Sequence, residues 1–151
     1  QLLKELGMVR GATHAEFIRG RADGKLYFLE IAARVGGANL ADMIEAASGV
    51  NPWREWARIE IANARGEQYQ LGERRRDSAG IAVCLARMEW PDLSTYDAPE
   101  VVWRMSKAWH AGLILRSPDT ARVQTLLNDY KERFAAEFVA KGEVLETGRN
   151  V

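Results

Sequence analysis

The turn that joins residues 12–19 to residues 25–32 is the feature that most constrains this chain. Both runs are rich in β-branched and aromatic residues, which predicts an antiparallel hairpin. A two-residue loop, Asp23-Gly24, would send Glu16 and Glu30 to opposite faces of the hairpin. A three-residue loop that also includes Ala22 would pair the two glutamates directly. The length of this turn therefore decides whether the two carboxylates converge.

The three-residue loop gives the hairpin one polar and one apolar face. The polar face would carry His14, Glu16, Ile18, Phe28, Glu30, Ala32 and Arg34. The other face would carry Phe17, Tyr27, Leu29 and Ile31, which is typical of a core-facing surface. We therefore predict this register, with Gly24 in a left-handed conformation.

Composition narrows the range of functions. A chain of 151 residues has the length of one domain, and Lys plus Arg equal Asp plus Glu at 21 each. Without net charge, nothing in the bulk electrostatics attracts nucleic acid or an anionic membrane. Cys84 is the single cysteine, so no internal disulfide forms, and no apolar run approaches the roughly 18 residues of a spanning helix. We expect a cytoplasmic protein that binds neither nucleic acid nor membranes.

Two helices are predicted after the hairpin. Asn39 can cap a helix that runs to residue 48 and stops at Gly49, and Asn51-Pro52 can begin a second helix that ends near residue 64. Core packing is the expected role of its apolar side, which carries Trp53, Trp56, Ala57 and Ile61.

The second half alternates between strand and helix patterns. Residues 81–89, 100–105 and 112–116 predict three strands, and Ser117-Pro118-Asp119 predicts the start of a final helix that reaches residue 140. Its apolar stripe consists of Val123, Leu126, Leu127, Tyr130, Phe134 and Phe138. The fold class is therefore α+β. We expect fraying from Gly142 onward.

The first residues resemble the last turns of a helix. Leu2, Leu3 and Leu6 form one stripe, Gly7 is a typical stop, and the chain begins with Gln rather than Met. These features predict that a segment of the protein precedes residue 1.

Two opposed carboxylates cost stability unless a cation or a proton relieves their repulsion. Mg²⁺ suits this role, because it takes one or two carboxylates and leaves its other positions to water and phosphates. If the strand continues past Glu30, Arg34 lies on the same face and can hold a phosphoryl group or a carboxylate. Gly36 and Gly37 then let backbone N–H groups approach an anion. By pattern alone, a solvated face and a functional site are equally good interpretations.

These residues resemble a known family. The segment "HAEF", followed by "DGKLYFLEIAARVGGANLADMIEAASGVN", is similar to the C-terminal part of an ATP-grasp domain. There a hairpin carries one Glu, then Glu-x-Asn-x-Arg, and leads through a glycine turn into a helix. The match covers residues 6–62, and the later strands and helix resemble the C-terminal extension of ATP-grasp carboxylate–amine ligases.

The resemblance implies an antiparallel sheet with helices packed on it, and ATP-dependent joining of a small carboxylate to an amine through an acylphosphate. Glu16 and Glu30 would bind Mg²⁺ or Mn²⁺ that bridges the phosphates of ATP, and Arg34 would hold the transferred phosphoryl group. Gly36 and Gly37 would contact the substrate, with His14 in the same pocket, although an exposed histidine without a role is an equal alternative.

The resemblance divides the chain at residue 66. Residues 1–66 would be the second half of the ATP-grasp core and residues 67–151 the extension, packed with it as one unit. The half that carries the remaining nucleotide-binding residues would precede residue 1, so the isolated chain is expected to bind ATP weakly and to be inactive. A bare sheet edge would also favour a homo-oligomer.

One position departs from the family pattern. Ala32 occupies the place where many members have a metal-ligating Asn, and a methyl group cannot ligate a metal. A small residue there, with "HAE" upstream, is similar to the amino-acid and dipeptide ligase branch. The alternative is a non-catalytic module that keeps the scaffold for binding or assembly.

Overall fold

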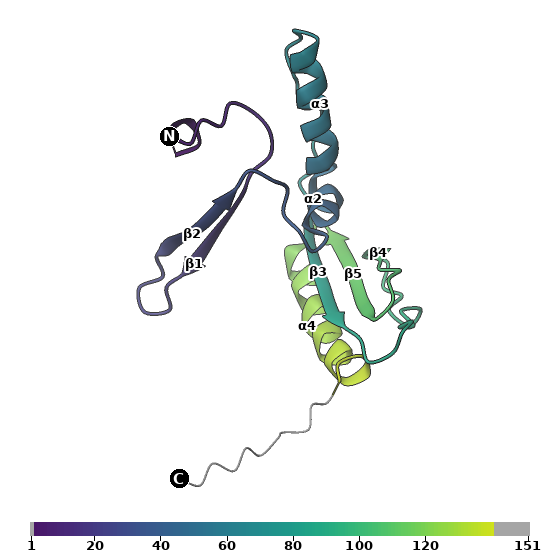
Figure 1. The fold of residues 1–151 in the computed structure, drawn as a ribbon. Coiled ribbons are helices and arrows are strands. Elements are labelled where there is room, and N and C mark those ends of the chain that lie inside the picture. The colour runs from purple at the N-terminus through teal and green to yellow at the C-terminus, as the bar shows by residue number, and fades with distance from the viewer. Residues whose placement is uncertain (1, 141–151) are drawn as a thin grey trace.

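A computed structural model describes residues 2–140, so the expected fraying beyond Gly142 lies outside the described residues. Within that range the chain forms an α+β structure with two separate antiparallel sheets (Figure 1). In chain order, the elements are α1 (Leu2–Glu5), β1 (His14–Arg19), β2 (Leu26–Ala32), α2 (Leu40–Ser48), α3 (Pro52–Ala64), β3 (Ser78–Leu85), β4 (Val101–Arg104), β5 (His110–Ser117) and α4 (Thr120–Glu137).

The second half of the chain forms a three-layer unit together with α2. Its sheet has the strand order β3-β5-β4 with antiparallel pairs throughout. The long helix α4 covers one face of this sheet, and α2 lies against the other (Figure 1). The packing of α4 is so close that a Cβ added at Gly80 would collide with the Leu127 side chain. The three strands predicted from the sequence are confirmed, with β3 and β5 each starting earlier than expected.

The main core lies between α4 and the sheet. It contains Ala86, Leu93, Tyr96, Ala111, Leu113, Leu115, Val123, Leu126, Tyr130, Phe134 and Phe138. Tyr96 is fully buried and meets Tyr130 and Phe134 edge to face, with ring centroids 4.9 and 5.1 Å away. Its hydroxyl donates to Glu137 Oε2 at 3.0 Å, and burial together with this contact raises the pKa of Tyr96. The predicted apolar stripe of α4 is thus confirmed as core.

Capping residues fix the helix boundaries. The Asn51 side chain accepts from the N–H groups of Trp53 and Arg54, at 3.0 and 3.3 Å, and Gly49 ends α2 in a left-handed conformation, as predicted. The expected side-chain cap at Asn39 is wrong. This residue has a φ of 60°, and its amide donates to the Asp42 carboxylate at 2.9 Å instead of accepting from the helix.

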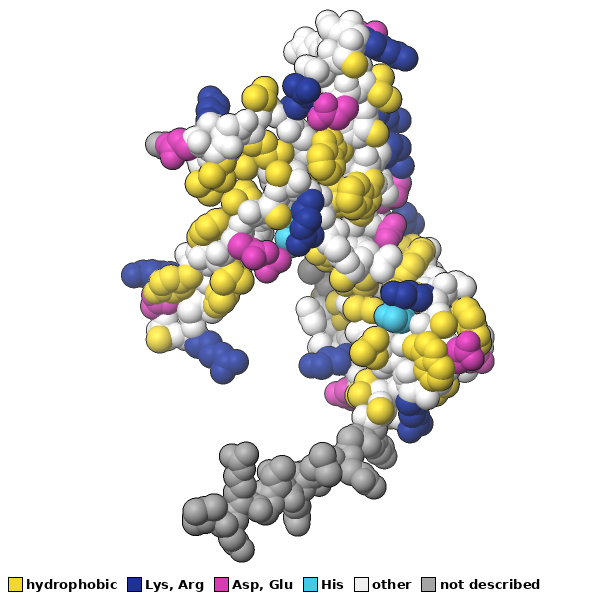
Figure 2. Space-filling view, viewed as in Figure 1, with side chains coloured by type: hydrophobic (Ala, Val, Ile, Leu, Met, Phe, Trp, Pro, Cys, Tyr) yellow, Lys and Arg dark blue, Asp and Glu magenta, His cyan; other side chains and the backbone are white. Residues whose placement is uncertain are grey.

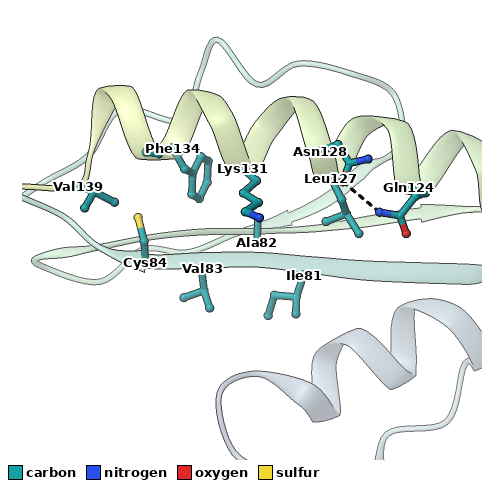
Figure 3. Close-up of a pocket in the computed structure, with 11 residues that line it drawn as sticks. Ile81, Ala82, Val83, Cys84, Gln124, Leu127, Asn128, Lys131, Phe134 and Val139 are labelled. Carbon is teal, nitrogen blue, oxygen red and sulfur yellow. Dashed lines mark hydrogen bonds between the residues drawn. The ribbon is translucent and has the colours of Figure 1, made fainter. Parts of the chain in front are cut away.

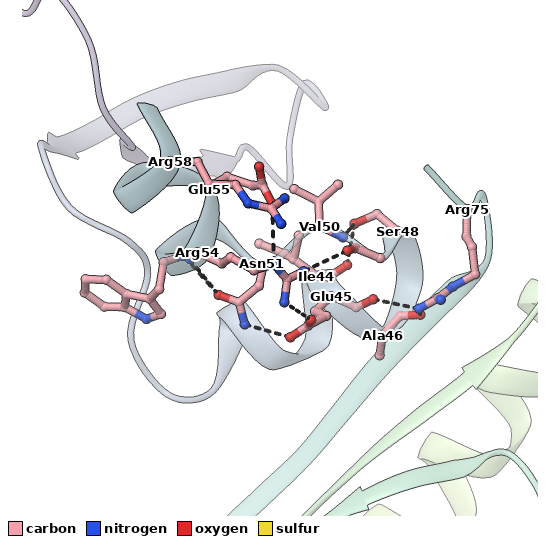
Figure 4. Close-up of polar contacts among 12 residues, drawn as sticks. Ile44, Glu45, Ala46, Ser48, Val50, Asn51, Arg54, Glu55, Arg58 and Arg75 are labelled. Carbon is pink, nitrogen blue, oxygen red and sulfur yellow. Dashed lines mark hydrogen bonds and ion pairs between the residues drawn. The ribbon is translucent and has the colours of Figure 1, made fainter. Parts of the chain in front are cut away.

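A polar junction ties α2, α3 and the loop before β3 together (Figure 4). The Glu45 carboxylate accepts from Asn51 Nδ2 and from Arg54 Nη1, both at 2.7 Å. Arg75 donates to the carbonyls of Glu45 and Ala46 at 3.0 and 3.2 Å, which places a cation at the negative end of α2. The two amide and guanidinium donors lower the pKa of Glu45 below its ordinary value of 4.5.

The predicted core role for the apolar side of α3 is wrong. Trp53 is 55% exposed and Ile61 is 50% exposed, whereas Glu55 on another side of the helix is buried. Tyr69 and Arg58 donate to the Glu55 carboxylate at 2.9 and 3.0 Å, which compensates for its burial. The reason is tertiary, because α3 extends away from the three-stranded sheet (Figure 1).

Among the described residues, no helix has both the length and the apolar character needed to span a membrane.

Replacing Phe134 by Ala is expected to lower the free energy of unfolding by about 3–5 kcal/mol, because the ring is buried between Tyr96 and Phe138. Urea unfolding followed by circular dichroism measures this change. The exposed helix residue Ile61 serves as the matched control, and Ile61→Ala should change stability by no more than about 0.5 kcal/mol. Equal losses in the two variants would contradict the assigned core.

The polar junction predicts a pH dependence. Since the pKa of Glu45 is lowered in the folded chain, its contribution to stability is present above pH 4.5 and is lost as the pH falls through the lowered value. The Glu45→Gln variant should therefore be less stable than the parent at pH 7, with the difference shrinking below pH 4.5. Thermal unfolding at several pH values tests this, with the exposed loop variant Glu73→Gln as control.

Candidate functional site

The hairpin places Glu16 directly opposite Glu30, as the sequence predicts. The same register pairs Ala15 with Ile31 and His14 with Ala32. Like charges opposite each other on antiparallel strands oppose strand pairing. The acidic pair is therefore a feature that the fold itself does not explain.

The loop that produces this register is not the predicted three-residue loop. Gly20 N–H donates to the Lys25 carbonyl at 2.8 Å and closes a four-residue loop over residues 21–24, in which Gly24 has the predicted positive φ of 68°. This loop shifts the pairing by one residue. A β-bulge then shifts it back, because Phe28 pairs with Phe17, Glu30 pairs with Glu16, and Leu29 between them has no partner.

The bulge also changes which side chains share a face. Phe28 meets Phe17, with ring centroids 5.7 Å apart, so the expectation that Phe28 joins the glutamates is wrong. Tyr27 instead lies opposite Ile18. The predicted core face is wrong as well, since Phe17, Tyr27 and Leu29 are 54–55% exposed. In the described part of the chain no apolar layer covers this hairpin, and its lower end projects away from the other elements (Figure 1).

His14 lies beside the acidic pair. Its Nε2 atom is 3.0 Å from Glu16 Oε1, and its side chain is 24% exposed. A Cβ added at Gly36 would lie 2.8 Å from His14 Nδ1, so this close approach requires glycine. The structure thus brings His14, Glu16 and Gly36 together, with Glu30 opposite Glu16.

Arg34 does not occupy the predicted position on the strand. The strand ends at Ala32, and Arg34 lies in a bend beyond it. Its Nη1 atom donates to the Val35 carbonyl at 3.2 Å, and within residues 2–140 it forms no ion pair with Glu16 or Glu30. The expectation that Arg34 extends the acidic face along a continuing strand is therefore wrong.

The turn between Gly36 and α2 has an unusual backbone. Ala38 and Asn39 both have positive φ, at 51° and 60°, although neither is glycine. Leu40 N–H donates to the Gly37 carbonyl at 3.0 Å, and Gly37 has no neighbour within 4 Å of an added Cβ. Strained residues of this kind concentrate at functional sites. Asn at position 39 is a weak signal for this conformation, and Ala38 gives none.

The donor set suits a hard cation with few protein ligands. Glu30 is exposed and has no hydrogen bond or ion pair from the described residues, and Glu16 has His14 as its partner. Acidic side chains and a histidine gather at the end of the hairpin nearest α2 (Figure 2). Within residues 2–140, no three or more His, Cys, Asp or Glu side chains are grouped so that they could hold a metal ion together. Two carboxylates fit Mg²⁺, which takes its other ligands from water and phosphates.

Comparisons with known proteins add no family assignment. No protein-family model matches the chain, and a search of curated proteins found no match.

The Glu30→Gln variant should stabilise the hairpin by about 0.2–1 kcal/mol in the absence of divalent cations, because it removes the repulsion between opposed carboxylates. Slower hydrogen exchange of the β1 and β2 amides would show this gain. Glu67→Gln, which neutralises an exposed loop residue, should leave these exchange rates unchanged. A less stable Glu30→Gln hairpin would indicate that Glu30 has an attractive partner instead.

Proposed function

We propose that this chain is part of an ATP-dependent carboxylate–amine ligase of the ATP-grasp type. The reaction would transfer the γ-phosphoryl group of ATP to a small carboxylate, and an amine would then displace phosphate from the acylphosphate. The proposal rests on the resemblance of residues 6–62 to the C-terminal part of the ATP-grasp domain.

The pairing of Glu16 with Glu30 is the observation that carries the proposal. An exposed hairpin gains nothing from two opposed carboxylates, since they weaken the pairing of its strands. A divalent cation between them would turn this repulsion into a binding site. Glu30 also lacks any competing cation among the described residues, which leaves its oxygens available to a metal.

Each predicted site residue receives one role in this proposal. Glu16 and Glu30 hold Mg²⁺ or Mn²⁺, which supplies charge neutralisation to the phosphates of ATP. His14 orients the Glu16 carboxylate through its 3.0 Å contact. Gly36 and Gly37 contact the substrate carboxylate. Arg34 holds the transferred phosphoryl group, and for that its side chain must leave the Val35 carbonyl.

The proposal also assigns different roles to the two parts of the chain. Residues 1–66 would carry the Mg-ATP contacts and residues 67–151 the C-terminal extension. A preceding half of the same protein would supply the other wall of the nucleotide site. The protein would act in the cytoplasm.

A second candidate function is a non-catalytic binding or assembly module. Two observations favour it, namely the methyl group of Ala32 in place of a ligand, and the Arg34 side chain, which is bonded to the neighbouring backbone. Such a module would keep the hairpin and lose phosphoryl transfer.

Metal binding tests the assigned Mg²⁺ site directly. Addition of Mn²⁺ and ATP to the ¹⁵N-labelled chain should broaden the amide signals of His14, Glu16 and Glu30 first. Glu30→Gln should abolish the selective broadening, and Glu73→Gln should keep it. We expect weak ATP binding, with a Kd above about 1 μM. Broadening elsewhere in the chain would contradict the assigned metal site.

Activity of the full-length protein separates the two candidates. The ligase should form ADP when amino acids are supplied as carboxylate and amine, and hydroxylamine should trap the acylphosphate as a hydroxamate. Glu30→Gln and Arg34→Ala should each lower kcat more than about 100-fold, as expected for lost transition-state charge stabilisation. Metal binding without hydroxamate formation would favour the non-catalytic module.

A further inference from the structure

The strand β3 has a free edge that lacks the usual protection against pairing. It spans eight residues, none of them charged and none a proline, and its pairing with β5 has no irregularity. On its other edge, the described part of the chain supplies no strand. Exposed edges of this kind pair readily with further strands.

The direction of the free backbone groups follows from the ladder between β3 and β5. The Ala86 N–H donates to the Trp109 carbonyl at 2.9 Å, in the same register that pairs Leu85 with His110. Mutually bonded pairs recur at every second residue of an antiparallel ladder. The N–H and C=O groups of Ile81 and Val83 therefore point away from β5, toward the free edge.

A groove follows this edge between β3 and α4 (Figure 3). Its volume is about 490 Å³, and four consecutive residues of β3, 81–84, line it together with Leu127, Phe134 and Val139. Consecutive side chains of a strand point to opposite faces, so a groove lined by all four runs along the strand edge. Val83 is 45% exposed and Leu85 is 71% exposed.

The other free edges in the described chain are protected. The strand β4 has four residues, includes Arg104 and is irregular between Val101 and Trp103. The hairpin strands carry Glu16 and Arg19 on β1 and Glu30 on β2, with a bulge between them. Short length, charge and bulges are the features that discourage edge pairing. Among these edges, β3 alone has none of them.

We propose that β3 pairs with β3 of a second copy of this chain. Two copies related by a two-fold axis bring identical strands together in antiparallel orientation and join the two sheets into a continuous six-stranded sheet. The match in length is exact by symmetry, and no like charges oppose each other along the uncharged strands. A charged edge such as β1 would instead bury Glu16 or Arg19 at the seam without a partner.

The helix α4 supports the same arrangement. It lies over β3 more than over β5, and the polar residues with which it lines the groove are Gln124, Asn128 and Lys131. In the two-fold pair, the two α4 helices flank the seam on one face of the joined sheet. Among the described residues, Lys131 is the single charged residue that lines the groove, so the association should depend little on salt.

Light scattering after size-exclusion chromatography tests the proposal on the 151-residue chain. The parent chain should have the mass of two copies, and the same mass in 0.5 M salt. Val83→Lys should raise the dissociation constant more than about tenfold and give monomers. Val102→Lys is the matched control, because Val102 on the edge strand β4 is 42% exposed, and this variant should stay dimeric. Leu85→Lys repeats the test if Val83→Lys fails to fold.

Three outcomes would overturn the proposal. The first is a parent chain that is monomeric at all concentrations. If removal of residues 141–151 then produces a dimer, that segment is identified as the occupant of the groove. A dimer that persists in both folded β3 variants is another. The third is a dimer lost in Leu26→Lys but kept in Val83→Lys, because the exposed hairpin would then form the interface.

Discussion

The packing of α4 against one face of β3 and β5 is the interaction on which most of the described structure depends. It buries the aromatic cluster around Tyr96 and leaves the opposite face of the sheet to α2. The polar junction at Glu45 then fixes α3 and the loop before β3 to α2. The elements from α2 to α4 are thus connected to one core, while the hairpin is attached through its base.

In the hairpin, by contrast, few contacts stabilise the structure and some oppose it. A two-stranded hairpin is marginally stable alone in water, and this one carries opposed glutamates and exposed aromatic residues. Its base has some support, because Leu3, Leu6 and Met8 line a small cavity together with Ile31, and Gly36 fits against His14. The exposed apolar residues and opposed glutamates of the hairpin contribute less to stability than the buried core around Tyr96.

Sequence patterns predicted the elements well where local chemistry decides. Asn51 and Gly49 mark helix ends, as predicted, through hydrogen bonds and backbone conformations that neighbouring residues provide. At the start of α4 the predicted cap, Ser117, is wrong, because Asp119 caps a helix that begins at Thr120. Sequence patterns failed to predict burial where it depends on distant segments. The apolar side of α3 has the same pattern as the buried stripe of α4, but no layer in the described chain covers it. The face assignments of Tyr27 and Phe28 failed because periodicity does not reveal a bulge.

The sequence by itself determined that Glu16 and Glu30 lie on neighbouring strands, because a turn with Gly24 brings the two runs together. It also determined the α+β class and the ends of most helices, since these depend on contacts within a few residues. The sequence also predicted that the two glutamates face each other, whereas the four-residue loop and the bulge that produce this pairing are seen only in the structure. The tertiary structure also decided that Arg34 lies beyond the end of β2 and that, among the described residues, β3 has an open edge. Sheet order depends on the packing of distant segments, which the local sequence pattern does not contain.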